Sequence, residues 1–176
     1  MGVRTVTSGD ILSEIEARFA TAKPEFRRLR AKLFKKSCVP TRDKVQIAGS
    51  LLVSRQFNGS GAWPALKTTE RQRLHSNVLG LMRGVLSEQY RDDDNMLNDG
   101  EVIRVYELRA PYAQVRFTRL RLCVRIINQA PLGLLSMLVG ALKDSRSWLA
   151  AVESDLVWMN ACNPTLQLST LKWFAF

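Results

Sequence analysis

Apolar residues recur at helical spacing along almost all of the 176 residues, and this pattern limits the possible folds more than any other feature of the chain. In the stretch after Thr68, for example, Leu74, Val78 and Leu81 are three or four positions apart, which places them on one face of an α-helix. Short loops that contain proline or glycine separate such stretches. The pattern predicts an all-α fold, an irregular bundle of about seven to eight short helices.

Capping residues, prolines and glycines set the expected ends of these helices. The predicted helices cover approximately residues 11–21, 24–36, 41–55, 68–85, 98–106, 111–128, 131–142 and 145–159. Pro24 is expected in the first turn of the second helix, and Thr41 and Ser145 are expected to cap their helices. Asn98 or Asp99 is expected to begin the short fifth helix.

Positive charge is concentrated in the first half of the chain. The net charge is +10, and residues 1–90 hold 16 basic and 7 acidic residues, whereas residues 91–176 hold 10 and 9. The acidic run RDDDN at residues 91–95 is the predicted boundary between a first domain over residues 1–90 and a second over 97–163, followed by a tail, 164–176. The excess charge favours an anionic partner such as nucleic acid over a membrane surface or an inert basic surface.

Residue types that carry enzyme or metal chemistry are sparse. Cys38, Cys123 and Cys162 are far apart without a CxxC pair, and His75 is the only histidine, so we expect no metal site and no cofactor. No phosphate-binding glycine loop or hydrolase motif is present, so we expect no catalytic residue. His75 is expected to be a surface or partly buried side chain. No apolar run reaches membrane-spanning length, and scattered thiols suit a reducing compartment, so we expect an intracellular protein.

The letters Tyr90-Arg91-Asp92-Asp93 fit the YxDD pattern of reverse-transcriptase catalytic loops. That chemistry needs two carboxylates at a tight turn between buried strands, where they hold divalent metal ions. Neither flank has the β-branched apolar run of such a strand. We therefore interpret these residues as a solvated acidic loop without a catalytic role.

A dense basic run lies between residues 23 and 44, with nine basic and two acidic residues. On a helix, four of the basic residues share one side, opposite an apolar side. The four are Arg28, Lys32, Lys35 and Lys36, and the apolar residues are Phe26, Leu29 and Leu33. Like charges one turn apart repel, and an anionic phosphate backbone would compensate them, so we favour phosphate binding over a solvated helix face.

Two further features concern packing in the second half. Arg116 and Arg119 fall within an otherwise apolar arc of the predicted helix over 111–128, and we expect an ion pair between helices there, with Asp155 as the candidate partner. Trp148 begins the apolar stripe of the last helix and is expected to pack against the same helix.

Several short motifs follow one another in an order that resembles a known family. The helix ending Ser50-Leu51-Leu52-Val53-Ser54-Arg55 leads through Asn58-Gly59-Ser60-Gly61 into Trp63-Pro64-Ala65-Leu66. Gly9 to Arg18 precede it, and Arg119 to Leu122 and Ser147 to Trp158 follow it. This order resembles the thumb and post-thumb region of non-LTR (LINE-type) retrotransposon reverse transcriptases. Gln56 and Phe57 depart from the pattern, because the family often has Leu and Tyr there.

The resemblance implies that the chain grips an RNA/DNA template–primer duplex and has neither a small-molecule substrate nor a membrane partner. The implied backbone contacts are Arg27, Arg28, Lys32, Lys35, Lys36, Lys44 and Arg55. The catalytic carboxylates of the family's palm have no counterpart here, so the chain alone is expected not to be an enzyme. A nuclear location is implied by the resemblance. The alternatives are a basic helical protein-interaction module and a retroelement remnant without activity.

Overall fold

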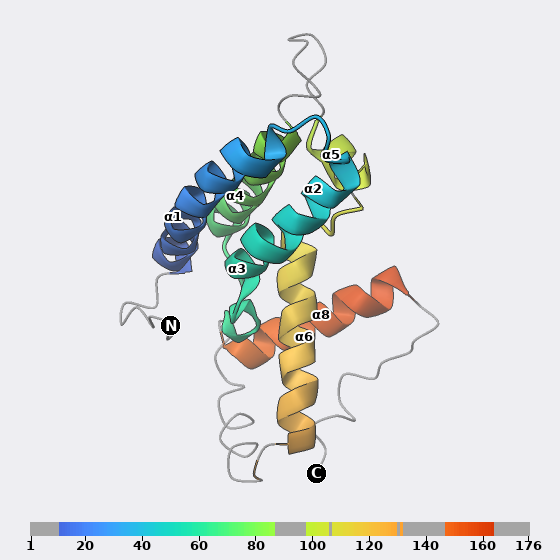
Figure 1. The fold of residues 1–176 in the computed structure, drawn as a ribbon. Coiled ribbons are helices and arrows are strands. Elements are labelled where there is room, and N and C mark those ends of the chain that lie inside the picture. The colour runs from blue at the N-terminus through green and yellow to red at the C-terminus, as the bar shows by residue number, and fades with distance from the viewer. Residues whose placement is uncertain (1–10, 87–97, 106, 130, 132–146, 164–176) are drawn as a thin grey trace. The chain divides into compact units, whose positions relative to one another are not determined.

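Helices dominate the computed structural model, which describes residues 11–86, 98–105, 107–129, 131 and 147–163 (Figure 1). No β-strand occurs within these ranges, which agrees with the predicted all-α class. Their α-helical segments join into six separate helices, against the seven to eight expected. The acidic run, the tail and most of the predicted helix over 131–142 lie outside the described residues.

The chain divides into two units. Unit 1 comprises residues 1–58 and 67–114, and unit 2 comprises residues 59–66 and 115–176. The glycine-rich turn thus groups with the C-terminal part of the chain, and residues 98–114 group with the N-terminal part. Each unit has its own cluster of buried apolar side chains.

Unit 1 begins with α1 (Ile11–Leu29), which continues without a break into the π-helical turn η1 (Arg30–Phe34). Pro24 lies inside α1, so the predicted start of a second helix at this residue is wrong. An interior proline removes one backbone hydrogen bond and costs about 3 kcal/mol. The buried face continues across it, with Ala22 before and Phe26 after packed in one core cluster, and this burial offsets the cost.

The second helix of unit 1 is built from three contiguous segments, α2 (Thr41–Ala48), the π-helical η2 (Gly49–Val53) and α3 (Ser54–Phe57). Pro40 is the N-cap residue, with φ −57° and ψ 143°, and no side chain caps this end. The predicted cap at Thr41 is therefore wrong by one residue. Thr41 is instead the first helical residue, because the fixed φ of Pro40 already suits the cap position.

Two more helices complete unit 1, α4 (Thr68–Leu86) and α5 (Asp99–Val105). The start of α5 agrees with the sequence prediction, since the N–H of Glu101 donates to Oδ1 of Asn98 at 2.9 Å and the N–H of Asn98 donates to Oε2 of Glu101 at 2.8 Å. This reciprocal pair is a capping box. At the start of α4, Oε2 of Glu70 accepts the N–H of Lys67 at 2.6 Å.

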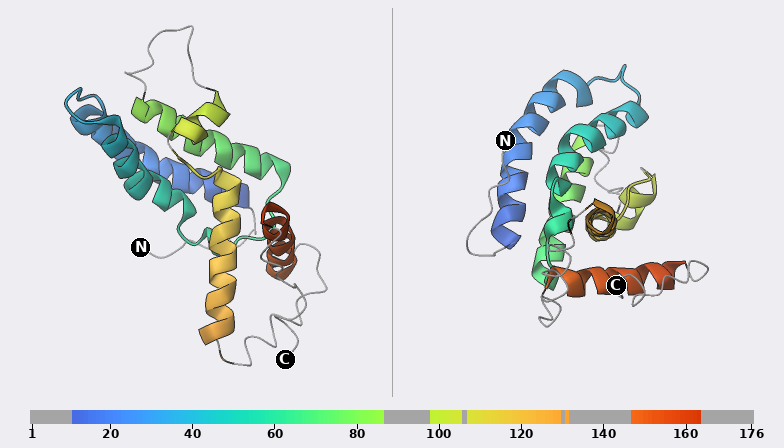
Figure 2. Two further views of the ribbon diagram at one scale, coloured as in Figure 1. Left: turned by 90° about the vertical axis from the view of Figure 1, so that its right-hand side faces the viewer. Right: turned by 90° about the horizontal axis from the view of Figure 1, so that it is seen from below.

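Helix α4 supplies half of the buried residues in the core of unit 1, and α1, α2 and α5 all pack against it (Figure 2). A Cβ atom at Gly84 would lie 2.5 Å from Cζ of Phe26, so the glycine allows the ring of α1 to approach α4. Phe26 in turn stacks on Phe34, with 6.1 Å between the ring centroids.

Unit 2 contains the short 3₁₀ turn η3 (Ser60–Ala62), most of α6 (Pro111–Gln129) and α8 (Trp148–Cys162). Ser147 caps α8, because its side chain accepts the N–H of Ala150 at 3.1 Å, so the predicted cap at Ser145 is wrong by two residues. A small apolar cluster joins the two helices, with Leu120, Cys123 and Val152 buried and Ile127, Trp148, Leu156 and Met159 packed around them. The predicted packing of Trp148 against α6 residues is confirmed. None of the helices within the described residues has the length and apolar character that crossing a membrane requires.

Candidate nucleic-acid interface

The basic run of unit 1 forms an exposed surface at the end of α1, in η1 and in the turn that follows. The exposed basic residues there are Lys23, Arg27, Arg28, Arg30, Lys32, Lys35, Lys36 and Arg42. The opposite side packs on the core through the half-buried residues Phe26, Leu29 and Leu33 and the buried Phe34. The two-sided helix predicted from the sequence is confirmed. We call the exposed side, Arg27 to Lys36, the basic face.

The π-helical turn shapes this surface. The N–H of Lys35 donates to the carbonyl oxygen of Arg30, five residues back, at 3.0 Å. Across this turn, Leu33 and Phe34 contact the core while Lys35 and Lys36 stay exposed.

The cations of the basic face remain exposed to solvent. Arg28 pairs with Glu25 at 3.3 Å, but its side chain remains 68% exposed. An exposed pair three residues apart contributes about 0.5 kcal/mol or less, so Arg28 can exchange Glu25 for a phosphate at small cost. A row of cations one helical turn apart, with water around it, suits an extended polyanion.

Two of the residues implied by the family resemblance lie apart from this surface. Lys44 is buried in α2 with only 5% of its surface exposed, because α2 turns this position toward the interior. Its ammonium group therefore does not extend into solvent in this structure. Arg55 is exposed on α3, near the C-terminal end of the second helix, whereas the basic face precedes the N-terminal end of that helix.

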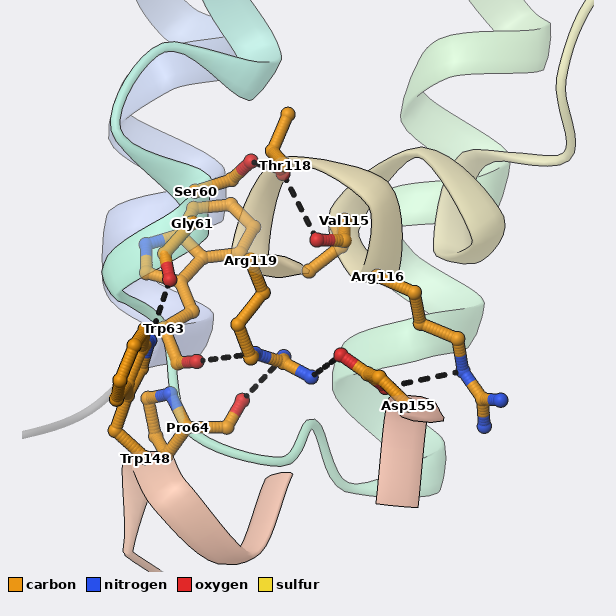
Figure 3. Close-up of polar contacts among 10 residues, drawn as sticks. All are labelled: Ser60, Gly61, Trp63, Pro64, Val115, Arg116, Thr118, Arg119, Trp148 and Asp155. Carbon is orange, nitrogen blue, oxygen red and sulfur yellow. Dashed lines mark hydrogen bonds and ion pairs between the residues drawn. The ribbon is translucent and has the colours of Figure 1, made fainter. Parts of the chain in front are cut away.

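In unit 2, Arg119 of α6 binds the backbone that follows the glycine-rich turn instead of facing solvent (Figure 3). Arg119 is fully buried, and its Nε and Nη2 atoms each donate at 2.9 Å, to the carbonyl oxygens of Trp63 and Pro64 respectively. Its Nη1 atom donates to Oδ2 of Asp155 at 2.6 Å. The predicted ion pair between helices is confirmed. The guanidinium of Arg119, on α6, thus binds both the backbone after the turn and Asp155 of α8.

Neighbouring contacts extend this arrangement. Nε of Arg116 lies 3.5 Å from Oδ1 of Asp155, and its guanidinium lies 4.8 Å from the ring centroid of Trp158. The hydroxyls of Ser60 and Thr118 are 2.9 Å apart, and the indole N–H of Trp148 donates to the carbonyl oxygen of Gly61. These side chains are used for packing within unit 2 and do not form part of the basic face.

Sequence reasoning missed that Arg119 binds the backbone of the turn. The available signal was its position inside an apolar arc, which indicates a buried cation but does not reveal which acceptors surround it. Trp63, which follows the turn, is 3% exposed and therefore belongs to a core.

His75 and Asp99 form the remaining polar cluster of interest, in unit 1. Nε2 of His75 lies 2.9 Å from Oδ2 of Asp99, and Arg83 donates to the other carboxylate oxygen. The Arg83 hydrogen bond, followed by the one from His75, holds the pKa of Asp99 below its ordinary value. His75 is partly buried, as expected, and its contact joins α4 to the first residue of α5.

No family model, no curated protein and no solved structure matches this chain. The described residues contain no group of three or more His, Cys, Asp or Glu side chains placed to hold a metal ion.

Proposed function

We propose that the chain binds duplex nucleic acid through the basic face, without preference for sequence. The observation that carries the proposal is a row of exposed cations backed by a packed apolar side. Such a row neutralises phosphates and releases their counterions, which supplies affinity but no base recognition. The contacts we assign are Arg27, Arg28, Lys32, Lys35 and Lys36, with Arg55 as an outlying contact, and the burial of Lys44 removes it from the set.

The resemblance to LINE-type thumb regions gives this proposal a more specific form. In that form the partner is an RNA/DNA template–primer duplex, and the chain holds the duplex while a palm supplies the catalytic carboxylates. Without a palm the chain is expected not to extend a primer. The rival classes, a basic protein-interaction module and an inactive remnant, lead to no salt-dependent binding of duplexes.

The direct test is the salt dependence of duplex binding, measured by fluorescence anisotropy on RNA/DNA and DNA duplexes. Replacing Arg28, Lys32, Lys35 and Lys36 together with Gln removes four phosphate contacts. The negative slope of the logarithm of the binding constant against the logarithm of the salt concentration should become less steep by about 0.9 for each contact on a B-form duplex. The matched control replaces four exposed cations elsewhere, Lys67, Arg104, Arg121 and Arg125, with Gln. Equal effects of the two variants would mean that only net charge matters and would refute the assignment to the basic face.

A second test uses the cysteines already present. Cys38 is exposed two residues after Lys36, and Cys162 is exposed at the end of α8. A bound duplex should slow alkylation of Cys38, measured by peptide mass spectrometry, while Cys162 in the same molecule serves as the reference. Equal alkylation of Cys38 with and without duplex would contradict the proposed location.

A further inference from the structure

The exposed cations of α1 and η1 form two rows, and one of the rows extends beyond the contacts assigned so far. Lys23, Arg27 and Arg30 follow one another at intervals of four and three residues, which places them along one side of the helix. Arg28 and Lys32, four residues apart, form a second row. We call these sets the first row and the second row. Lys23 and Arg30 are exposed but are not among the assigned nucleic-acid contacts.

The two rows lie on opposite flanks of the same helix. Successive residues of an α-helix are rotated by about 100°, which separates the centres of the two rows by about 140°. Two contacts agree with this separation. The ammonium of Lys23 lies 6.0 Å from the ring centroid of Phe19, whereas the guanidinium of Arg28 lies 3.3 Å from a carboxylate oxygen of Glu25. The rows therefore diverge and do not form one continuous line of charge.

Between the rows, the crest of the helix carries short side chains. Ala20, Pro24 and Ala31 are exposed there. A partner that contacts the crest can approach the helix closely, and the longer cations on both flanks then extend past the line of contact. The crest selects no ligand by itself, because the charge that attracts a polyanion lies on the two flanks.

The separation of the rows suits two phosphate backbones. An α-helix with its side chains is about 10–12 Å in diameter, so cations on opposite flanks lie about 10 Å or more apart. The major groove of B-form DNA is about 12 Å wide, with one backbone along each edge. A-form duplexes offer a wide, shallow minor groove instead. Within one row, neighbouring Cβ atoms are only about 5–6 Å apart, which suits phosphates of a single strand.

We propose that α1 and η1 lie along a wide groove of the duplex, with the first row on the phosphates of one strand and the second row on those of the other. Lys23 and Arg30 thereby become contacts to the backbone. This inference rests on the proposed function and adds that both strands are bound at once. A single strand can engage only one row at a time, because the rows point away from each other.

Two variants that lose the same charge separate the rows. Lys23→Gln/Arg30→Gln removes two cations from the first row, and Arg28→Gln/Lys32→Gln removes the second row. The measured quantity is the salt slope, the negative slope of the logarithm of the binding constant against the logarithm of the salt concentration, from fluorescence anisotropy. On a DNA duplex, each variant should make the salt slope less steep by about 1.8, and the combined variant by about 3.6, since each phosphate contact contributes about 0.9.

Single-stranded DNA tests the assignment of the rows to two strands. Each two-residue variant retains the other row, so its salt slope on a single strand should change by no more than about one contact, or 0.7. The combined variant should lose about 1.4 on a single strand. The matched control, Arg121→Gln/Arg125→Gln, removes two exposed cations four residues apart on α6 and should leave both salt slopes near the wild type. Circular dichroism checks that the variants keep their helices.

The outcomes separate this inference from the proposed function. A wild-type chain without salt-dependent duplex binding would refute the proposed function, and the two-strand mode with it. An unchanged duplex salt slope in Lys23→Gln/Arg30→Gln, with a reduced slope in Arg28→Gln/Lys32→Gln, would overturn the two-strand mode alone. Loss of two full contacts by each two-residue variant on the single strand as well as on the duplex would place all the cations on one strand, and it would likewise overturn the two-strand mode alone.

Discussion

Gln56 is a fully buried amide at a position where a hydrocarbon side chain should be more stable. Its side chain in α3 is 0% exposed, and neither Oε1 nor Nε2 has a hydrogen-bond partner within the described residues. Burying an amide without a partner costs about 1–3 kcal/mol by protein mutational data. The backbone carbonyl of Gln56 accepts from Arg18 at 3.1 Å, a bond that a side-chain substitution leaves intact.

Gln56→Leu replaces this amide with an apolar group of similar size, so the free energy of unfolding should rise by about 1–3 kcal/mol. For a chain of this size each kcal/mol raises the melting temperature by about 2–4 °C. The LINE-type pattern often has Leu at this position, which agrees with the predicted increase in stability. The assay is thermal and urea unfolding followed by circular dichroism.

The matched control is Gln72→Leu on the exposed side of α4, which should change the unfolding free energy by no more than about 0.5 kcal/mol. A loss of 1 kcal/mol or more in Gln56→Leu would refute the reasoning. It would mean that the amide is hydrogen-bonded in solution, to a buried water or to residues outside the described ranges.

Three further predictions concern Gly61 in unit 2, Gly80 in α4 and the α4–α5 contact. In Gly61→Ala the new methyl group would lie 2.7 Å from the carbonyl oxygen of Thr118, which is backbone and cannot move aside, so stability should fall by about 1–3 kcal/mol. Gly80→Ala, in α4 with open space around it, should instead raise stability by about 0.5–1 kcal/mol, and thermal shifts of the same sign in both variants would contradict this. Because the pKa of Asp99 is lowered in the folded state, its ion pairs stabilise above the unfolded-state value near 4 and are lost as the pH falls below it. Asp99→Asn should therefore be less stable than the wild type at pH 7, by less than about 1 kcal/mol for this half-exposed group, and the difference should become smaller as the pH falls from 4 to 3. A difference of equal size at pH 7 and pH 3 would contradict the assignment.

Local sequence rules determined the features that depend on neighbours along one helix. The spacing of Phe26, Leu29 and Leu33 already placed the basic residues on the opposite side, because a helix separates its faces by a fixed rotation per residue. The same rule identified Arg119 as a cation within an apolar arc, and Asp155 was the acid in reach on the last helix. These predictions needed only periodicity and charge.

Tertiary structure decided the features that depend on what lies across from a residue. Pro24 remains inside a helix because the buried face on both sides of it outweighs one lost hydrogen bond. Lys44 reads as one more cation of the basic run, yet α2 turns it inward. The carbonyl oxygens of Trp63 and Pro64 meet Arg119 only after more than 50 intervening residues have folded. Burial is a property of the packed chain, and the residues that create it are distant in the sequence.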